Sequence, residues 1–153
     1  MIRRLAGVAV AGVAVALMGF GSVASAGTNL CVATNGEVRA QKGTASCSAD
    51  EGAGNVAIAH GDKSTATVLS GVRNRATASG DSSTAATYDG DGNTAIATGD
   101  SSIALAGGGD GNTAIATGDH SIALAGEGDG NTATAITDGC TADATGSGQT
   151  DTC

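Results

Sequence analysis

Small polar and apolar residues alternate in short runs along the chain from about residue 53 onward. The runs 94–98 (TAIAT) and 103–106 (IALA) have the period of two, and the Thr and Ile content, that are typical of β-strands. Between the runs lie segments rich in Gly, Asp and Asn, such as 99–102 and 107–112, where Asp and Asn side chains can cap a turn. The pattern therefore predicts an all-β chain in which strand and turn alternate.

The alternation repeats every 19 residues. The consecutive units 91–109 (DGNTAIATGDSSIALAGGG) and 110–128 (DGNTAIATGDHSIALAGEG) are nearly identical. Strand, turn, strand and turn make one coil of a two-sided solenoid, in which equivalent strands pair in parallel about 4.8 Å apart. We expect a small parallel β-solenoid of about five coils over 53–147, with an N-terminal cap at 27–52 and a short tail at 148–153.

The unit also predicts which residues face the core. The columns of equivalent residues that begin at Ala57 and Ala59 are alanine in every unit, whereas the alternate columns admit His60, Arg75 and Asp143. Because a charge cannot be buried in so thin a core, we expect the alanines inside and the Thr and Ile side chains outside. The opposite assignment, with isoleucine inside and the charged residues as exceptions near the ends, stays open at this point.

Two further columns hold one polar residue in all five units. They are the asparagines Asn55, Asn74, Asn93, Asn112 and Asn131 and the aspartates Asp62, Asp81, Asp100, Asp119 and Asp138. Stacked amides can hydrogen-bond from coil to coil, which predicts a structural role for the asparagines. Stacked carboxylates repel one another unless they are solvated, hydrogen-bonded or neutralised. Each aspartate therefore either caps amides within its own turn or shares a Ca²⁺ ion between coils.

Calcium is the weaker of these two interpretations. A second acidic column, Asp91, Asp110 and Asp129, lies beside the asparagines, and 108–112 (GGDGN) begins like the calcium-binding nonapeptide of glycine-rich β-rolls. However, Thr113 stands where that motif requires Asp. We assign no metal ligands and expect no cofactor.

The N-terminus has the pattern of a secretory signal peptide at 1–26. A basic start (MIRR) precedes an apolar run at 5–21, and the small residues Ala24 and Ala26 mark a cleavage site. We expect a secreted or cell-envelope protein with no membrane span after cleavage. The four cysteines of an exported chain then suggest two disulfides. In a solenoid only Cys31–Cys47 and Cys140–Cys153 lie close enough to pair, one at each end.

Charge and composition restrict the classes of molecule that the protein could bind. Without Arg3 and Arg4 there are five basic residues against 15 acidic ones, and no Lys or Arg follows Asp91. This argues against nucleic acid and anionic membranes as partners. Tyr88 is the only aromatic residue after the signal peptide, so the chain lacks the large side chains that fill a conventional hydrophobic core. A disordered acidic secreted tail is the alternative to the solenoid.

Nothing in the sequence indicates an enzyme. Asp119, His120 and Ser121 are the residue types of a catalytic triad, but three neighbours on one turn cannot form a nucleophile–base–orienter relay. The equivalent places in other units hold Lys63 or Ser101. We therefore interpret these residues as surface turn residues.

The segments 93–107 (NTAIATGDSSIALAG) and 112–126 (NTAIATGDHSIALAG) resemble the head repeats of trimeric autotransporter adhesins. The resemblance implies a parallel β-roll, three chains side by side and adhesion to host matrix or other surfaces. The repeat here is longer than the usual head unit and comes with cysteines, which those heads lack.

The columns of Thr94, Thr113 and Thr132, and of Thr98 and Thr117, are also similar to β-solenoid antifreeze proteins, whose ice-binding face is a flat array of threonines. That resemblance implies ice binding.

We expect a secreted structural or interaction module that binds through its outward faces. The partner is a second copy of the chain or an extracellular or envelope surface; ice binding and a disordered tail are the alternatives. The candidate face residues are Thr94, Ile96, Thr98, Thr113, Ile115 and Thr117 on one side and Ile103, Leu105, Ile122 and Leu124 on the other.

Overall fold

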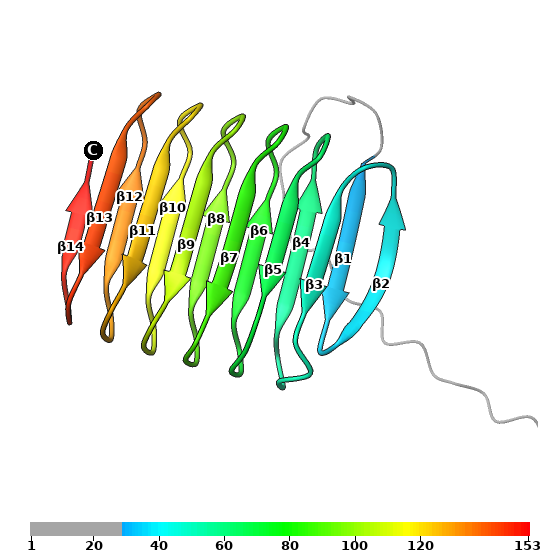
Figure 1. The fold of residues 1–153 in the computed structure, drawn as a ribbon, viewed down its shortest axis with the longest axis horizontal. Coiled ribbons are helices and arrows are strands. Elements are labelled where there is room, and N and C mark those ends of the chain that lie inside the picture. The colour runs from blue at the N-terminus through cyan, green and yellow to red at the C-terminus, as the bar shows by residue number, and fades with distance from the viewer. Residues whose placement is uncertain (1–28) are drawn as a thin grey trace, which may run out of the picture.

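The computed structural model describes residues 29–153, so the predicted signal peptide and its cleavage site lie outside the described residues. The described part of the chain consists of strands and turns, without a helix, stacked along one long axis (Figure 1). The strands are β1 (Leu30–Thr34), β2 (Glu37–Lys42), β3 (Ser46–Ala49), β4 (Val56–His60), β5 (Thr65–Val68), β6 (Arg75–Ala78), β7 (Thr84–Tyr88), β8 (Thr94–Ala97), β9 (Ile103–Gly107), β10 (Thr113–Ala116), β11 (Ile122–Gly126), β12 (Thr132–Ala135), β13 (Thr141–Thr145) and β14 (Thr150–Thr152).

Two sheets form the two walls of the solenoid. One has eight strands in the order β14-β12-β10-β8-β6-β4-β1-β2, and the other has six in the order β13-β11-β9-β7-β5-β3. From β4 and β3 onward the pairing is parallel, and among the strands from β3 to β13 the paired residues are 19 positions apart, as Thr94 and Thr113 are. The predicted parallel β-solenoid is thus confirmed.

The solenoid has about six coils, one more than the sequence predicts. The additional coil begins at β3, within the segment expected to be a cap. Strand β3 pairs in parallel with β5 and places Cys47 beside Ala66. At the other end, β14 lies in the segment expected to be a tail and pairs in parallel with β12.

The N-terminal end closes with antiparallel strands. Strand β1 pairs antiparallel with both β4 and β2, so the chain turns back before the parallel coils begin. Every residue of β2 is exposed, and Arg39 forms an ion pair with Glu37. A charged, exposed edge strand discourages pairing with other chains, so β2 protects this end.

Alanine fills the space between the sheets. Within each strand of the regular coils, buried alanines alternate with half-exposed residues, as Ala95 and Ala97 do with Thr94 and Ile96. The predicted alanine-lined core is confirmed, and the alternative with isoleucine inside is wrong. Val68 and Thr87, both in the six-stranded sheet near the N-terminal end, take inward strand positions that are alanine in the later coils.

The turns allow the coils to approach closely. A Cβ atom on Gly99 would overlap the carbonyl group of Gly118 in the next coil. Glycine at this corner therefore permits the stacking distance that the parallel ladders require. Two residues further along, Ser101 and His120 take left-handed backbone conformations with φ of 55° and 57°.

Candidate binding faces

The outer surface of the eight-stranded sheet carries rows of threonine and isoleucine. We call the outward residues of β8, β10, β12 and β14, with those directly after β8, β10 and β12, the Thr/Ile face. Its residues are Thr94, Thr113, Thr132 and Thr150 in one row, Ile96, Ile115, Thr134 and Thr152 in the next, and Thr98, Thr117 and Ile136 in the third. No charged side chain points outward within this face. Arg75 and His60 belong to the same rows but lie in the coils nearer the N-terminus.

The structure brings together all six residues predicted for this face and adds five more. The five are Thr132, which the sequence already places in the threonine column, and Thr134, Ile136, Thr150 and Thr152. The 19-residue repeat does not predict Thr150 and Thr152, because β14 pairs with β12 at a spacing of 18 residues, with Thr132 beside Thr150. Ile136 is 58% exposed, which is unusual for a side chain of its size.

The six-stranded sheet has an apolar patch on its neighbouring strands β9 and β11. The Ile/Leu patch consists of Ile103, Leu105, Ile122 and Leu124, the residues predicted for the second face. All four are half-buried, and each pairs with its equivalent in the neighbouring strand. At the edge of the same sheet, the ring of Tyr88 crosses Gly107 and its hydroxyl reaches Gly126, so the aromatic side chain lies along the glycine column.

The asparagine column holds neighbouring coils together through the backbone. All five asparagines are fully buried. Each Oδ1 accepts a hydrogen bond from the backbone N–H of the equivalent residue in the next coil, as from Asn93 to Asn74 (2.7 Å) and from Asn112 to Asn93 (2.8 Å). The Nδ2 of Asn74 donates to the carbonyl oxygen of Gly90, also in the next coil. The ladder runs from coil to coil as predicted, but through backbone groups rather than from amide to amide.

The aspartate columns correct one expectation. Four of the five carboxylates accept from the backbone N–H of the equivalent residue in the preceding coil: Asp81 from Asp62, Asp100 from Asp81, Asp119 from Asp100 and Asp138 from Asp119, at 2.9–3.0 Å. The same bond joins the second acidic column, where Asp110 accepts from Asp91. The caps therefore span two coils instead of closing one turn. A carboxylate reaches the preceding coil because the turns stack in register.

Serine forms a further column, which the sequence pattern does not predict. Ser64, Ser83, Ser102 and Ser121 are fully buried, and each hydroxyl donates to the carbonyl oxygen three residues earlier at 2.6–2.9 Å. Ser121 donates to Gly118, so its hydroxyl is turned into the core, while His120 beside it is exposed. The side chains of the Asp119-His120-Ser121 segment are thus not arranged as a catalytic relay.

Both predicted disulfides are present. Cys31 bonds to Cys47 at the N-terminal end, with Cα atoms 5.5 Å apart, and Cys140 bonds to Cys153 at the C-terminal end, with Cα atoms 6.1 Å apart. Cys140 occupies the next place in the serine column, and Cys153 follows β14 and hydrogen-bonds to the backbone of Thr134 and Ile136. Each disulfide therefore ties a terminal strand to the regular coils.

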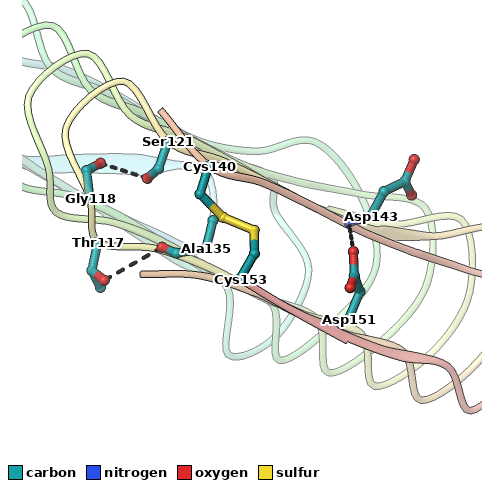
Figure 2. Close-up of a disulfide and its surroundings, with 8 residues drawn as sticks. All are labelled: Thr117, Gly118, Ser121, Ala135, Cys140, Asp143, Asp151 and Cys153. Carbon is teal, nitrogen blue, oxygen red and sulfur yellow. Dashed lines mark hydrogen bonds between the residues drawn. A yellow bond between two sulfur atoms is a disulfide. The ribbon is translucent and has the colours of Figure 1, made fainter. Parts of the chain in front are cut away.

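An inward-pointing carboxylate completes the C-terminal end (Figure 2). Asp151 lies in β14 beside Ala133, in the column that is alanine elsewhere. Its Oδ2 accepts a hydrogen bond of 2.7 Å from the backbone N–H of Asp143 in β13, the last strand of the six-stranded sheet. The carboxylate takes the place of the carbonyl group that a further coil would supply.

The charges are distributed unevenly along the solenoid. All five basic residues of the described chain lie between Arg39 and Arg75, whereas nine of the 15 acidic residues lie from Asp91 onward. The N-terminal part is thus nearly neutral, and the C-terminal part carries acidic turns along both edges. Within 29–153, no three His, Cys, Asp or Glu side chains come together in a group that could hold a metal ion.

Comparisons with known proteins give no relative. No family model matches the sequence, and no curated protein or solved structure is similar to it at a significant level. Among residues 29–153 there is no helix long and apolar enough to cross a membrane. The disulfides are compatible with an oxidising compartment outside the cytosol.

Proposed function

We propose that the protein is a secreted, non-catalytic binding module that attaches to an extended, uncharged surface through the Thr/Ile face. The observation that supports this proposal is that the larger apolar side chains lie on the outside of the solenoid. The isoleucines of β8 and β10 lie outside the solenoid, while the core is built from alanine. Large apolar side chains left half-exposed in regular rows stabilise a single chain less than buried ones, and are typical of a contact surface.

The chemistry of the face defines the kind of target. It presents methyl and hydroxyl groups in rows that repeat with the coils, about 4.8 Å apart. It lacks charged side chains, and the edges beside it carry the aspartate columns. Anionic polymers would be repelled, because binding them requires positive charge. A target that is flat, repetitive and uncharged suits such a surface best.

Export agrees with this role. The predicted signal peptide would direct the chain out of the cytosol, where disulfides form and persist. Adhesin-like binding, as implied by the resemblance of the repeats, belongs to the same proposal. The disordered-tail alternative receives no support from the ordered coils.

The test compares adsorption of the mature, oxidised protein with that of a Thr113→Lys variant. The probes are methyl-terminated and hydroxyl-terminated monolayers, microcrystalline cellulose and ice. Arg75 already occupies the same row in β6, so a lysine at 113 is compatible with the fold. We expect the wild type to adsorb to at least one probe and Thr113→Lys to weaken adsorption about tenfold or more, equivalent to about 1.4 kcal/mol.

Thr65→Lys is the matched control, because Thr65 points outward from β5 on the opposite sheet. This variant should adsorb like the wild type. Failure of the wild type to adsorb to any probe, or equal losses in both variants, would refute the proposed face.

Ice is the second candidate target. One observation favours it: threonine occupies the same row in four successive strands, at Thr94, Thr113, Thr132 and Thr150. No aromatic ring lies on this face for stacking against sugar rings, since Tyr88 belongs to the other sheet. If ice is the target, growing crystals become faceted with the wild type and with Thr65→Lys but stay rounded with Thr113→Lys. Rounded crystals in all three solutions exclude ice.

A further inference from the structure

We propose that a second copy of this chain covers the Ile/Leu patch, so that two solenoids pack through their six-stranded sheets with their long axes antiparallel. The inference concerns the opposite side of the molecule from the Thr/Ile face and does not depend on what that face binds. Its result would be a particle that presents a Thr/Ile face on each of its two outer sides.

The patch is uncharged, unlike the edges around it. The outward residues of β5, β7, β9 and β11 are Thr, Ala, Ile, Leu and Tyr, with glycine at the ends of β9 and β11. The first charge on this face toward the C-terminus is Asp143 in β13. An apolar centre with polar residues around it is the usual composition of a protein–protein contact.

The sequence of the patch makes it complementary to itself. Strands β9 and β11 are identical (IALAG) and lie next to each other. A two-fold axis between them, parallel to the strands, places Ile103 and Leu105 of one copy against Ile122 and Leu124 of the other. The same residues meet from both sides, as a two-fold interface requires.

The charge distribution selects the antiparallel orientation. All basic residues lie at or before Arg75, and nine acidic residues lie from Asp91 onward. Antiparallel axes bring the acidic half of one copy toward the half of the other that contains the basic residues. Parallel axes would align the two acidic halves, and like charges repel.

The size of the patch predicts a weak dimer. With the axis between β9 and β11, four strands of each copy overlap, from β7 to β13. Strands about 4.8 Å apart and about five residues of 3.3 Å long give roughly 300 Å² per copy. Contacts below about 1,200 Å² in total are weak or transient. We therefore expect dissociation at high micromolar concentration, so that dimers form where the protein is concentrated.

Sedimentation equilibrium of the mature, oxidised protein, from about 10 μM to 1 mM, tests the dimer. The variant is Leu105→Asp. The fold accepts an aspartate in this column, because Asp143 occupies it in β13. The control is Thr67→Asp in the same column of β5, outside the expected overlap. We expect the wild type and Thr67→Asp to associate to dimers and Leu105→Asp to require at least tenfold higher concentration.

A monomeric wild type at 1 mM, a trimer, or equal association of both variants would overturn the proposal. Circular dichroism of both variants establishes that they are folded. Since neither substitution touches the Thr/Ile face, adsorption of Leu105→Asp to surfaces separates failure of the dimer from failure of the proposed function.

A nitroxide label on Thr67→Cys tests the orientation by electron–electron distance measurement at about 1 mM. Antiparallel axes place the two labels roughly 25 Å apart, because β5 lies about two and a half strand spacings from the axis. Parallel axes bring both β5 strands together at roughly 10–15 Å, close to the usual separation of packed sheets. The short distance would overturn the antiparallel arrangement.

Discussion

The buried asparagines use both atoms of their amides, and in Asn112 the oxygen links to the next coil while the nitrogen binds the end of the preceding strand β9. Asn112 accepts from the backbone N–H of Asn131 (2.9 Å), and its Nδ2 donates to the carbonyl oxygen of Gly107 (3.2 Å). These groups lie at turns, where the β-ladder ends and backbone groups would otherwise be buried without partners. One side-chain type at one position therefore satisfies the backbone in every coil.

Substitution Asn112→Ala should destabilise the solenoid by about 2 kcal/mol or more. The alanine leaves the N–H of Asn131 and the carbonyl of Gly107 unpaired, and each buried unpaired group costs about 1–3 kcal/mol. Denaturant unfolding followed by circular dichroism measures the loss. The neighbouring Thr113→Ala, at a half-exposed position, should change the unfolding free energy by less than about 0.5 kcal/mol. Similar values for the two variants would contradict the role of the ladder.

At the residue scale, the sequence predicts the asparagines as a ladder and the alanines as the core, because both recur at one period. It does not predict where the aspartate bonds go. From the sequence, the acceptor for the N–H of Asp100 could lie in the same turn or in the next coil. The acceptor is the carboxylate of Asp119 because the turns stack in register. The serine column stays hidden for a related reason, since a short run of Ser and Asp is typical of any turn.

At the scale of strands, the two ends of the solenoid are closed differently. The N-terminal end has an antiparallel pair, β1 and β2, with a charged and exposed outer strand. The C-terminal end has one short strand, β14, held by Cys153 and by the bond from Asp143 to Asp151. An open sheet edge attracts further strands, so both ends prevent unlimited stacking of one chain on another.

Removing the C-terminal disulfide with Cys140→Ser and Cys153→Ser should loosen β13 and β14 without unfolding the central coils. A serine at 140 continues the buried serine column, so the local turn is expected to persist. A disulfide that closes a loop of this length contributes about 3 kcal/mol. In amide hydrogen exchange we expect faster exchange in 141–152 and unchanged protection in β8 and β10, because coils interact only with their neighbours.

The matched control is the pair Cys31→Ser and Cys47→Ser, which should act on β1 and β3 alone. A uniform loss of protection from hydrogen exchange along the whole solenoid, in either double variant, would show that each disulfide does not stabilise its own end alone.

The strands of the regular coils could be predicted from the sequence, whereas the terminal strands could not. Strand β14 pairs at a spacing of 18 residues, and Asp151 stands where the column elsewhere has alanine. Strand β3 keeps the spacing of 19 but places Cys47 in an alanine column. In both strands, a residue that helps to close the end of the solenoid, Asp151 or Cys47, stands where the other coils have alanine.

For the whole molecule, a core of alanine makes a thin, flat solenoid with two broad outer faces. The Thr/Ile face lies on one sheet and the Ile/Leu patch on the other, and the acidic turns run along the edges between them. The larger side chains are therefore available for contacts with a surface and with a second copy. Both proposals depend on this single arrangement of small residues inside and large residues outside.

The most direct test of that arrangement compares the unfolding free energies of Ala114→Ile and Ile115→Ala, at neighbouring positions of β10. Ala114 is fully buried, so an isoleucine there overpacks the core and should cost about 3 kcal/mol or prevent folding. Ile115 is half-exposed, so its replacement should cost about 1 kcal/mol or less. The opposite order, with Ala114→Ile tolerated and Ile115→Ala severely destabilising, would place the isoleucines in the core and contradict the account.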